Sequence, residues 1–89
     1  MEKITYKITD KNGIHARPAG LLVKEAGKFK SVITITNMSN DNKSEANKLF
    51  GVMGLNVKCG DEVNVIIDGE DEEKAYEEMS RFFKENLWP

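Results

Sequence analysis

The sequence predicts an α+β fold in which helices cover one face of an open β-sheet. One observation is that several segments alternate polar and apolar residues, as strands with one solvated face do. A second is that other segments place apolar residues at helical spacing. The third is their order along the chain, β-α-β-β-α-β-α, without repeats or linkers. Because alternating strands leave one face to water, we expect an open-faced sandwich with the helices on the other face.

The first part of the chain predicts a strand, a helix and a second strand. Residues 3–9 alternate like a half-buried strand, and residues 10–13 have turn chemistry. The period then changes to that of an amphipathic helix, which ends near Gly27. The apolar positions of this helix are Ala19, Leu22, Val23 and Ala26. Residues 31–36 are rich in β-branched side chains and predict the second strand.

The later part is less regular until its last helix. Residues 37–42 are predicted as a turn or a short disordered excursion, and residues 43–47 as a weak edge strand. Crowded apolar residues interrupted by two glycines indicate a brief helix over 49–55. A clean alternation over 62–67 predicts the fourth strand. The final helix has an acidic first turn, which suits the helix dipole, and an apolar face made by Ala75, Met79, Phe82 and Phe83.

Length and composition exclude several classes of protein. The chain has 89 residues, so we expect residues 1–89 to form a single domain. Its net charge of −2 argues against a nucleic-acid partner, and no apolar run approaches the ~20 residues of a membrane span. A small secreted protein would carry several cysteines, whereas this one has only Cys59, so we expect it in the cytoplasm. One histidine and one cysteine make no zinc motif, so no metal or cofactor is implied.

The residues best able to carry chemistry lie in Gly-Ile-His-Ala-Arg-Pro, residues 13–18. A helix begins in this hexapeptide, so His15 lies at or near the N-cap, and the backbone N–H groups of Ala16 and Arg17 are free to bind an anion. The Arg17 guanidinium can bind phosphate through two hydrogen bonds, and a neutral imidazole is a nucleophile. These features predict a phosphohistidine site at His15. On the pattern alone, a capping or surface histidine is the more common case.

The same residues resemble a known signature. Gly-Ile-His-Ala-Arg-Pro-Ala, residues 13–19, resembles the active-site motif of HPr, the histidine phosphocarrier family of the bacterial sugar phosphotransferase system. Residues 49–55 and 58–63 resemble the family's short helix and the turn into its last strand. The resemblance covers the whole chain in order. It implies a four-stranded antiparallel sheet with three helices on one face.

The resemblance also implies roles for single residues. His15 matches the phosphorylated histidine, modified at the ring nitrogen nearer the backbone, and Arg17 matches the arginine that steadies the phosphate. The positions that match or adjoin the family's partner-binding surface are Gly20, Lys24, Lys28, Lys48, Leu49, Phe50 and Met53. For the apolar members of this set the alternative is core packing. For Lys24 and Lys28 it is an ordinary solvated helix face.

The implied activity is that of a phosphocarrier, not of an independent enzyme. Such a protein accepts a phosphoryl group from PEP-dependent Enzyme I and passes it to the IIA domains of sugar permeases. We expect it to act as a monomer, without membrane insertion, and with regulatory proteins as further partners. Two alternatives stay open: a paralogue that uses the same histidine for regulation or for a dedicated sugar system, or a binding module that contacts an enzyme or a transcription factor without phosphoryl transfer. Intact His15 and Arg17 favour the carrier, because a pure binding module does not need them.

Two positions depart from the family pattern. Lys48 stands where relatives in Gram-positive bacteria often carry a regulatory serine, and the segment before it is slightly longer than usual. Ser44 is the one nearby substitute for that serine. Gly20 replaces a larger residue and is expected to loosen the first helix. Neither departure changes the phosphate chemistry expected at His15, but the first argues against serine-based regulation.

Overall fold

The computed structural model describes residues 1–8 and 16–86, and for residues 16–18, 85 and 86 it describes the backbone path. The elements are β1 (Glu2–Lys7), α1 (Ala16–Ala26), β2 (Val32–Asn37), β3 (Lys43–Glu45), α2 (Leu49–Met53), β4 (Glu62–Asp68) and α3 (Glu72–Asn86). This order confirms the predicted β-α-β-β-α-β-α arrangement. Residue 9, which the sequence assigns to the first strand, lies outside the described residues.

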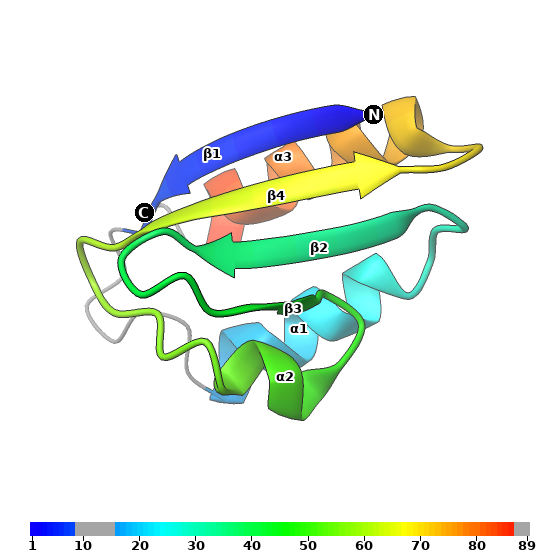
Figure 1. Cartoon of the computed structure of the whole chain (residues 1–89). Helices are drawn as coiled ribbons and strands as arrows, with labels where there is room; N and C mark the ends of the chain where they lie inside the picture. Colours follow the sequence, from blue (N-terminus) through cyan, green and yellow to red (C-terminus); the bar gives the residue numbers. More distant parts are fainter. Residues whose placement is uncertain (9–15, 87–89) are drawn as a thin grey trace.

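The four strands form one antiparallel sheet in the spatial order β1-β4-β2-β3 (Figure 1). The last strand of the sequence, β4, therefore lies inside the sheet and pairs with both β1 and β2. Val65 illustrates the register, because it lies opposite Ile4 of β1 and Ile35 of β2. Opposed residues share a face, so these three apolar side chains form a continuous row across the sheet.

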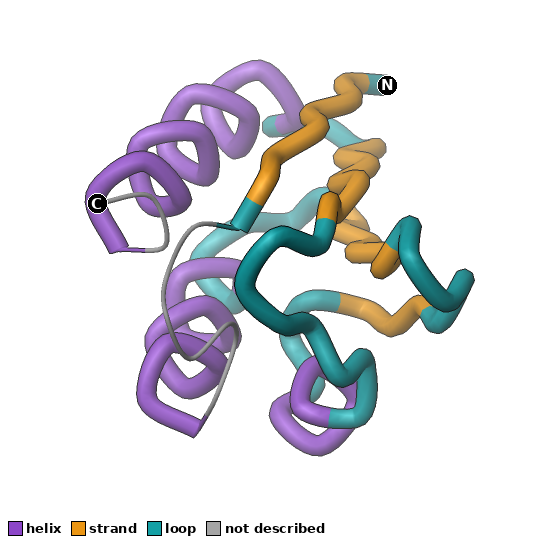
Figure 2. Tube along the Cα trace, turned by 90° about the vertical axis from the view of Figure 1, so that its left-hand side faces the viewer, coloured by secondary structure: helices purple, strands orange, loops and turns teal. Residues whose placement is uncertain are grey.

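The helices lie on one face of the sheet, as predicted (Figures 1 and 2). Helix α3 packs on β1 and β4, α2 packs on β3, and α1 lies between the two other helices. The opposite face is open and carries half-exposed polar residues such as Thr34, Thr36 and Asn64. No helix in the described part of the chain has both the length and the apolar character needed to cross a membrane.

The core fills the space between the sheet and the helices. Val63, Val65 and Ile67 of β4 have no exposed surface, as expected for the inward positions of an inner strand. The Phe83 ring of α3 stacks on Tyr6 of β1, with ring centroids 4.6 Å apart. The apolar faces predicted for the first strand and the last helix are therefore the buried faces.

The connection between β2 and β3 is an ordered turn rather than a disordered excursion. Its first residue, Asn37, is also the last residue of β2, and its side chain is fully buried. The Asn37 N–H donates to the Asn42 carbonyl at 2.8 Å, which closes the turn. Asp41 takes a φ of 61°, the left-handed region that Asn and Asp tolerate better than most residues. The predicted edge strand that follows is β3, with three paired residues.

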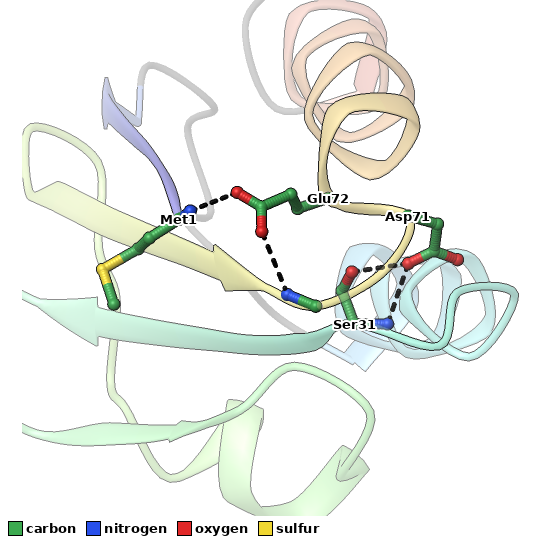
Figure 3. Close-up of polar contacts among 5 residues, drawn as sticks. Met1, Ser31, Asp71 and Glu72 are labelled. Atoms are coloured by element: carbon green, nitrogen blue, oxygen red, sulfur yellow. Dashed lines mark hydrogen bonds and ion pairs between the residues drawn. The ribbon is translucent and has the colours of Figure 1, made fainter.

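Two adjacent carboxylates tie the start of α3 to the sheet (Figure 3). Asp71 accepts hydrogen bonds from the backbone N–H and the hydroxyl of Ser31. Glu72 accepts the Gly69 N–H at 3.4 Å and pairs with the α-ammonium group of Met1. Only glycine fits at residue 69, because a Cβ atom there would lie 2.5 Å from the Ser31 Cα. The N-terminus, the start of β2 and the start of α3 are thereby joined at one end of the molecule.

Candidate functional site

The residues predicted to bind phosphate lie at the start of α1. His15 itself is outside the described residues, and for Arg17 the backbone alone is described. Helix α1 begins at Ala16, directly after His15 in the sequence, which confirms that the hexapeptide leads into a helix. The N–H groups of Ala16 and Arg17 thus belong to a first turn, where N–H groups lack partners within the helix. The positive end of the helix dipole lies at the same place.

Burial of one face holds α1 in position. Ala19, Leu22 and Ala26 are buried in the core, as their helical spacing predicts. Gly20 points away from this face, because a Cβ atom built on it meets nothing within 4 Å. The helix continues through Gly20 without a break, so the loosening expected from the glycine does not interrupt it.

Helix α2 presents the apolar residues predicted to contact partners. Leu49 and Met53 are 38% and 39% exposed, and Phe50 is 85% exposed. These three residues are called the apolar patch below. Val52 is the buried residue of α2 and Leu55 is buried just after it, so together they attach this segment to the core. Core packing is therefore excluded as the role of Phe50, and a large apolar side chain so exposed is typical of a binding surface.

The basic residues predicted on α1 lie on a different flank from the one that contacts α2. Lys24 and Lys28 line a groove between α1 and α3, together with Leu21, Glu25 and Phe82. The Lys28 Nζ lies 3.0 Å from a Glu25 carboxylate oxygen. The structure thus brings Lys24 and Lys28 together, but not into the apolar patch. Leu21 also lines this groove and was not predicted from the sequence as part of a site. The available signal was that Leu21 is an apolar residue outside the buried face of its helix, and in the structure it is 42% exposed.

Lys48 lies immediately before α2, at its N-cap position. Its side chain makes no capping hydrogen bond, and its Nζ lies 3.5 Å from a carboxylate oxygen of Glu45. Ser44, in β3, is a half-buried residue, and its hydroxyl donates to the Glu45 carbonyl at 3.1 Å. Ser44 also lies against Gly51 of α2. The two candidate regulatory positions therefore differ, because Lys48 is exposed whereas Ser44 is half-buried and lies against Gly51 of α2.

Other reactive groups are dispersed over the described residues. Cys59 is exposed, and within residues 1–8 and 16–86 no three His, Cys, Asp or Glu side chains gather in a way that could hold a metal ion. Three features of the described residues are therefore taken as candidates for the predicted site: the first turn of α1, the apolar patch and the groove beside Lys24.

Comparison with known proteins places these features in a family. The family model described as "PTS HPr component phosphorylation site" matches residues 2–85. The phosphocarrier protein HPr of Mycoplasma capricolum is 40% identical over 81 residues, which cover 91% of this chain and 89% of that protein.

Two solved structures extend this similarity. A histidine-containing phosphocarrier protein from Mycoplasma superposes with a TM-score of 0.91 and 36% identity, covering 98% of this chain and 97% of that one. The Bacillus subtilis catabolite repression protein Crh, a domain-swapped intertwined dimer, superposes with a TM-score of 0.73 and 35% identity, covering 96% and 95%. The chain therefore belongs to the HPr family, the phosphocarrier proteins of the phosphotransferase system.

Proposed function

We propose that this chain accepts a phosphoryl group on His15 from Enzyme I and passes it to the IIA domains of sugar permeases. The observation that carries this proposal is the signature at residues 13–19, which leads into α1 within a chain that matches the HPr family over residues 2–85. The start of α1 supplies what a phosphoryl acceptor needs, namely backbone donors and a favourable dipole.

The transfer step requires one nucleophile and a site for a dianion. The lone pair of the His15 Nδ1, with the ring proton on Nε2, attacks the phosphorus of phosphorylated Enzyme I. A nitrogen–phosphorus bond forms as the bond between phosphorus and the donor atom of Enzyme I breaks. The backbone N–H groups of Ala16 and Arg17 and the Arg17 guanidinium stabilise the charge of the bound phosphoryl group. Transfer to a IIA domain repeats this exchange with His15 as the leaving group.

Partner recognition is assigned to the apolar patch. Phe50 is the most exposed of the large hydrophobic residues in the described part of the chain, and methionine and aromatic side chains suit a surface that serves several partners. Lys24, on the neighbouring helix, is exposed and suits an acidic partner surface. Lys28 contributes less to this interaction, because its ammonium group already pairs with Glu25.

We propose that residues 1–89 form a single domain that works as a monomer in the cytoplasm. A single cysteine supports that compartment, because a small secreted domain would need several. On this chain the proposed transfer uses only His15, Arg17 and backbone N–H groups, so the proposal assigns it no resident metal or cofactor.

A regulatory paralogue that acts purely as a binding module is the second candidate, and the similarity to Crh is the observation that favours it. Such a protein would contact an enzyme or a transcription factor and would not relay phosphate. The two candidates differ in what they require of His15, because only the carrier must be phosphorylated there and must return the phosphoryl group.

Incubation of the full chain with Enzyme I and labelled PEP tests the proposal. We expect acid-labile label on the chain, which is lost on addition of a IIA domain and is absent from His15→Ala. Arg17→Ala should still be labelled but about 10- to 100-fold more slowly, because one charge-assisted phosphate contact is removed. Labelling of His15→Ala would overturn the site. A wild-type chain that folds but takes no label would favour the regulatory paralogue.

A further inference from the structure

Helix α2 carries the apolar patch but cannot define its own position. It has five residues, of which Val52 is the buried one, and Lys48 at its N-cap provides no side-chain hydrogen bond. Isolated helices need about 12–15 residues to be even marginally stable in water. The direction in which the patch points must therefore be set by contacts from other parts of the chain.

Such contacts converge on the carbonyl of Leu55, just beyond α2. The Asn37 side-chain amide donates to this carbonyl at 2.9 Å, and the Asn40 side-chain amide donates to it at 3.1 Å. The Leu55 N–H in turn donates to the Val52 carbonyl at 3.2 Å, so Leu55 continues directly from the helix. Two asparagines of the β2–β3 turn thus hold the C-terminal end of α2, and we call this pair the asparagine clamp.

Hydrogen bonds to both its nitrogen and its oxygen fix the orientation of the Asn37 side-chain amide. Its nitrogen also lies 3.3 Å from a carboxylate oxygen of Asp61, and its oxygen accepts the Ser39 N–H at 3.0 Å. Hydrogen bonds from the Lys58 N–H, the Ser39 hydroxyl and the Asn37 amide, in that order of importance, hold the pKa of Asp61 below its ordinary value. Asp61 is therefore an ionised acceptor at neutral pH, and the amide of Asn37 cannot be reversed without losing its partners.

Asn40 supplies the second half of the clamp from an exposed position. Its side-chain oxygen accepts the Asn42 N–H at 3.0 Å while its nitrogen donates to Leu55. Asn42 belongs to the same turn and is also exposed, but its side chain donates to neither Leu55 nor Asp61 within the described region. The turn therefore contains a clamp residue and a neighbour of the same type that is not part of the clamp.

We propose that Asn37 and Asn40 are positioning residues for partner recognition, which fix the angle at which α2 presents the apolar patch. This proposal rests on the function proposed above, in which that patch contacts Enzyme I. A change in the clamp should alter how tightly the partner binds, without altering the phosphoryl transfer that follows. The clamp lies at the C-terminal end of α2, and among the described residues it makes no hydrogen bond to the patch or to the start of α1.

Steady-state transfer from Enzyme I to the full chain, with Asn40→Asp and Asn42→Asp as a matched pair, tests the proposal. Both variants add one negative charge to the same turn. Asn40→Asp keeps the acceptor for the Asn42 N–H but replaces the donor to Leu55 with an oxygen. We expect Asn40→Asp to raise the KM of Enzyme I for the chain about three- to tenfold, the effect of losing one hydrogen bond, with kcat unchanged. Asn42→Asp should leave both constants at wild-type values.

A measurement without any partner accompanies the kinetics. The Val52 and Gly54 N–H groups donate to the carbonyls of Lys48 and Phe50, so their hydrogen exchange reports the order of α2. We expect exchange of both to accelerate in Asn40→Asp more than in Asn42→Asp, while the amides of β4 keep their protection. An equal rise in KM for both variants, or a fall in kcat with KM unchanged, would overturn the positioning role.

Phe50→Ala, measured in parallel, distinguishes two claims: that the apolar patch binds Enzyme I, and that the asparagine clamp positions the patch. If it raises KM while Asn40→Asp does not, the patch binds Enzyme I and the clamp does not position it. If neither Phe50→Ala nor Asn40→Asp changes KM, the proposed docking surface itself is wrong, and the positioning role is overturned with it.

Discussion

Ser44 of β3 and Gly51 of α2 are packed so closely that a Cβ atom at residue 51 would overlap the Ser44 hydroxyl and lie 3.0 Å from the Ser44 Cβ. The glycine is therefore what allows the short helix to rest against the edge strand. Helix α2 is held beyond its C-terminal end by hydrogen bonds to Leu55 and at Gly51 by this contact. The two kinds of contact can be tested separately.

Gly51→Ala is expected to destabilise the fold by about 1–3 kcal/mol, the usual cost of overpacking. Gly20→Ala is the matched control, because a Cβ atom at residue 20 meets nothing within 4 Å. It should stabilise the protein by about 0.5–1 kcal/mol, since alanine favours a helix over glycine. Urea denaturation measures both changes. The cost of Gly51→Ala should shrink in a Ser44→Ala background, and an unchanged cost would show that Ser44 is not the obstacle.

Phe50→Ala should weaken binding of Enzyme I while leaving the stability of the fold nearly unchanged. The side chain is 85% exposed, so the free energy of unfolding should change by no more than about 0.5 kcal/mol. Loss of an aromatic residue at an interface centre should weaken binding of Enzyme I by about 2 kcal/mol, or roughly 30-fold in Kd. Phe83→Ala is the control, because Phe83 is buried and its truncation should cost about 3–5 kcal/mol of stability. A large stability loss in Phe50→Ala would contradict the interface role.

Phosphorylation by an HPr serine kinase should be absent from this chain. Lys48 has no hydroxyl, and Ser44 is a half-buried residue that lies against Gly51 of α2, so a kinase has little room to reach its hydroxyl. Incubation with the kinase and ATP, followed by mass spectrometry, should show no phosphate at Ser44. Lys48→Ser should restore an acceptor and gain one phosphate. Efficient addition at Ser44 in the wild-type chain would mean that the regulatory site has moved rather than disappeared.

Asp71 should make the stability of the protein depend on acid pH. Hydrogen bonds from the Ser31 hydroxyl and from the N–H groups of Lys30 and Ser31 lower its pKa in the folded state. Because the folded pKa lies below the unfolded value of about 3.9, the contribution is complete above that pH and is lost as pH falls through the folded pKa.

Ser31→Ala removes the largest cause, so we expect the pKa of Asp71 to rise toward its ordinary value in an NMR titration. The stability difference between this variant and the wild type should be largest near neutral pH and shrink in acid. Ser39→Ala is the control, because the Ser39 hydroxyl bonds to Asp61 at 3.0 Å and not to Asp71. An Asp71 titration that is the same in Ser31→Ala and in the wild type would contradict this account.

The elements of the fold could be predicted because their signals are local. The alternation of Ile4, Tyr6 and Ile8 and the acidic start of α3 are each visible within a few residues. The strand order could not be predicted from these patterns, because the residues of a single segment do not show which strands will pair with it. Val65 lies between Ile4 and Ile35 in the structure, and nothing near Val65 in the sequence indicates this. That information is in the packing of distant residues. The family resemblance implied a four-stranded antiparallel sheet, and the structure supplies the order of its strands.

Some features of the site could be predicted from local sequence, whereas others depend on contacts between distant residues and were missed. Exposure of Phe50 follows from the crowding of apolar residues in a helix too short to bury them all. The burial of Asn37 was missed, because an asparagine before a polar segment indicates a turn on composition alone. The available signal was that Asn37 continues the inward alternation of Ile33 and Ile35. The roles of His15 and Arg17 remain sequence-based predictions, since His15 and the Arg17 side chain lie outside the described region.

The position of β4 between β1 and β2 has a consequence for the order in which the protein can be made. On the ribosome β1 is synthesised first, yet its pairing partner Glu62–Asp68 emerges only after more than half of the chain has followed. The hairpin of β2 and β3 is the one strand pairing among the described residues that can close early. Loop closure over such a distance is entropically costly and slows folding. Until β4 is available, β1 therefore has no strand to pair with and one edge of β2 stays open, and open strand edges favour aggregation.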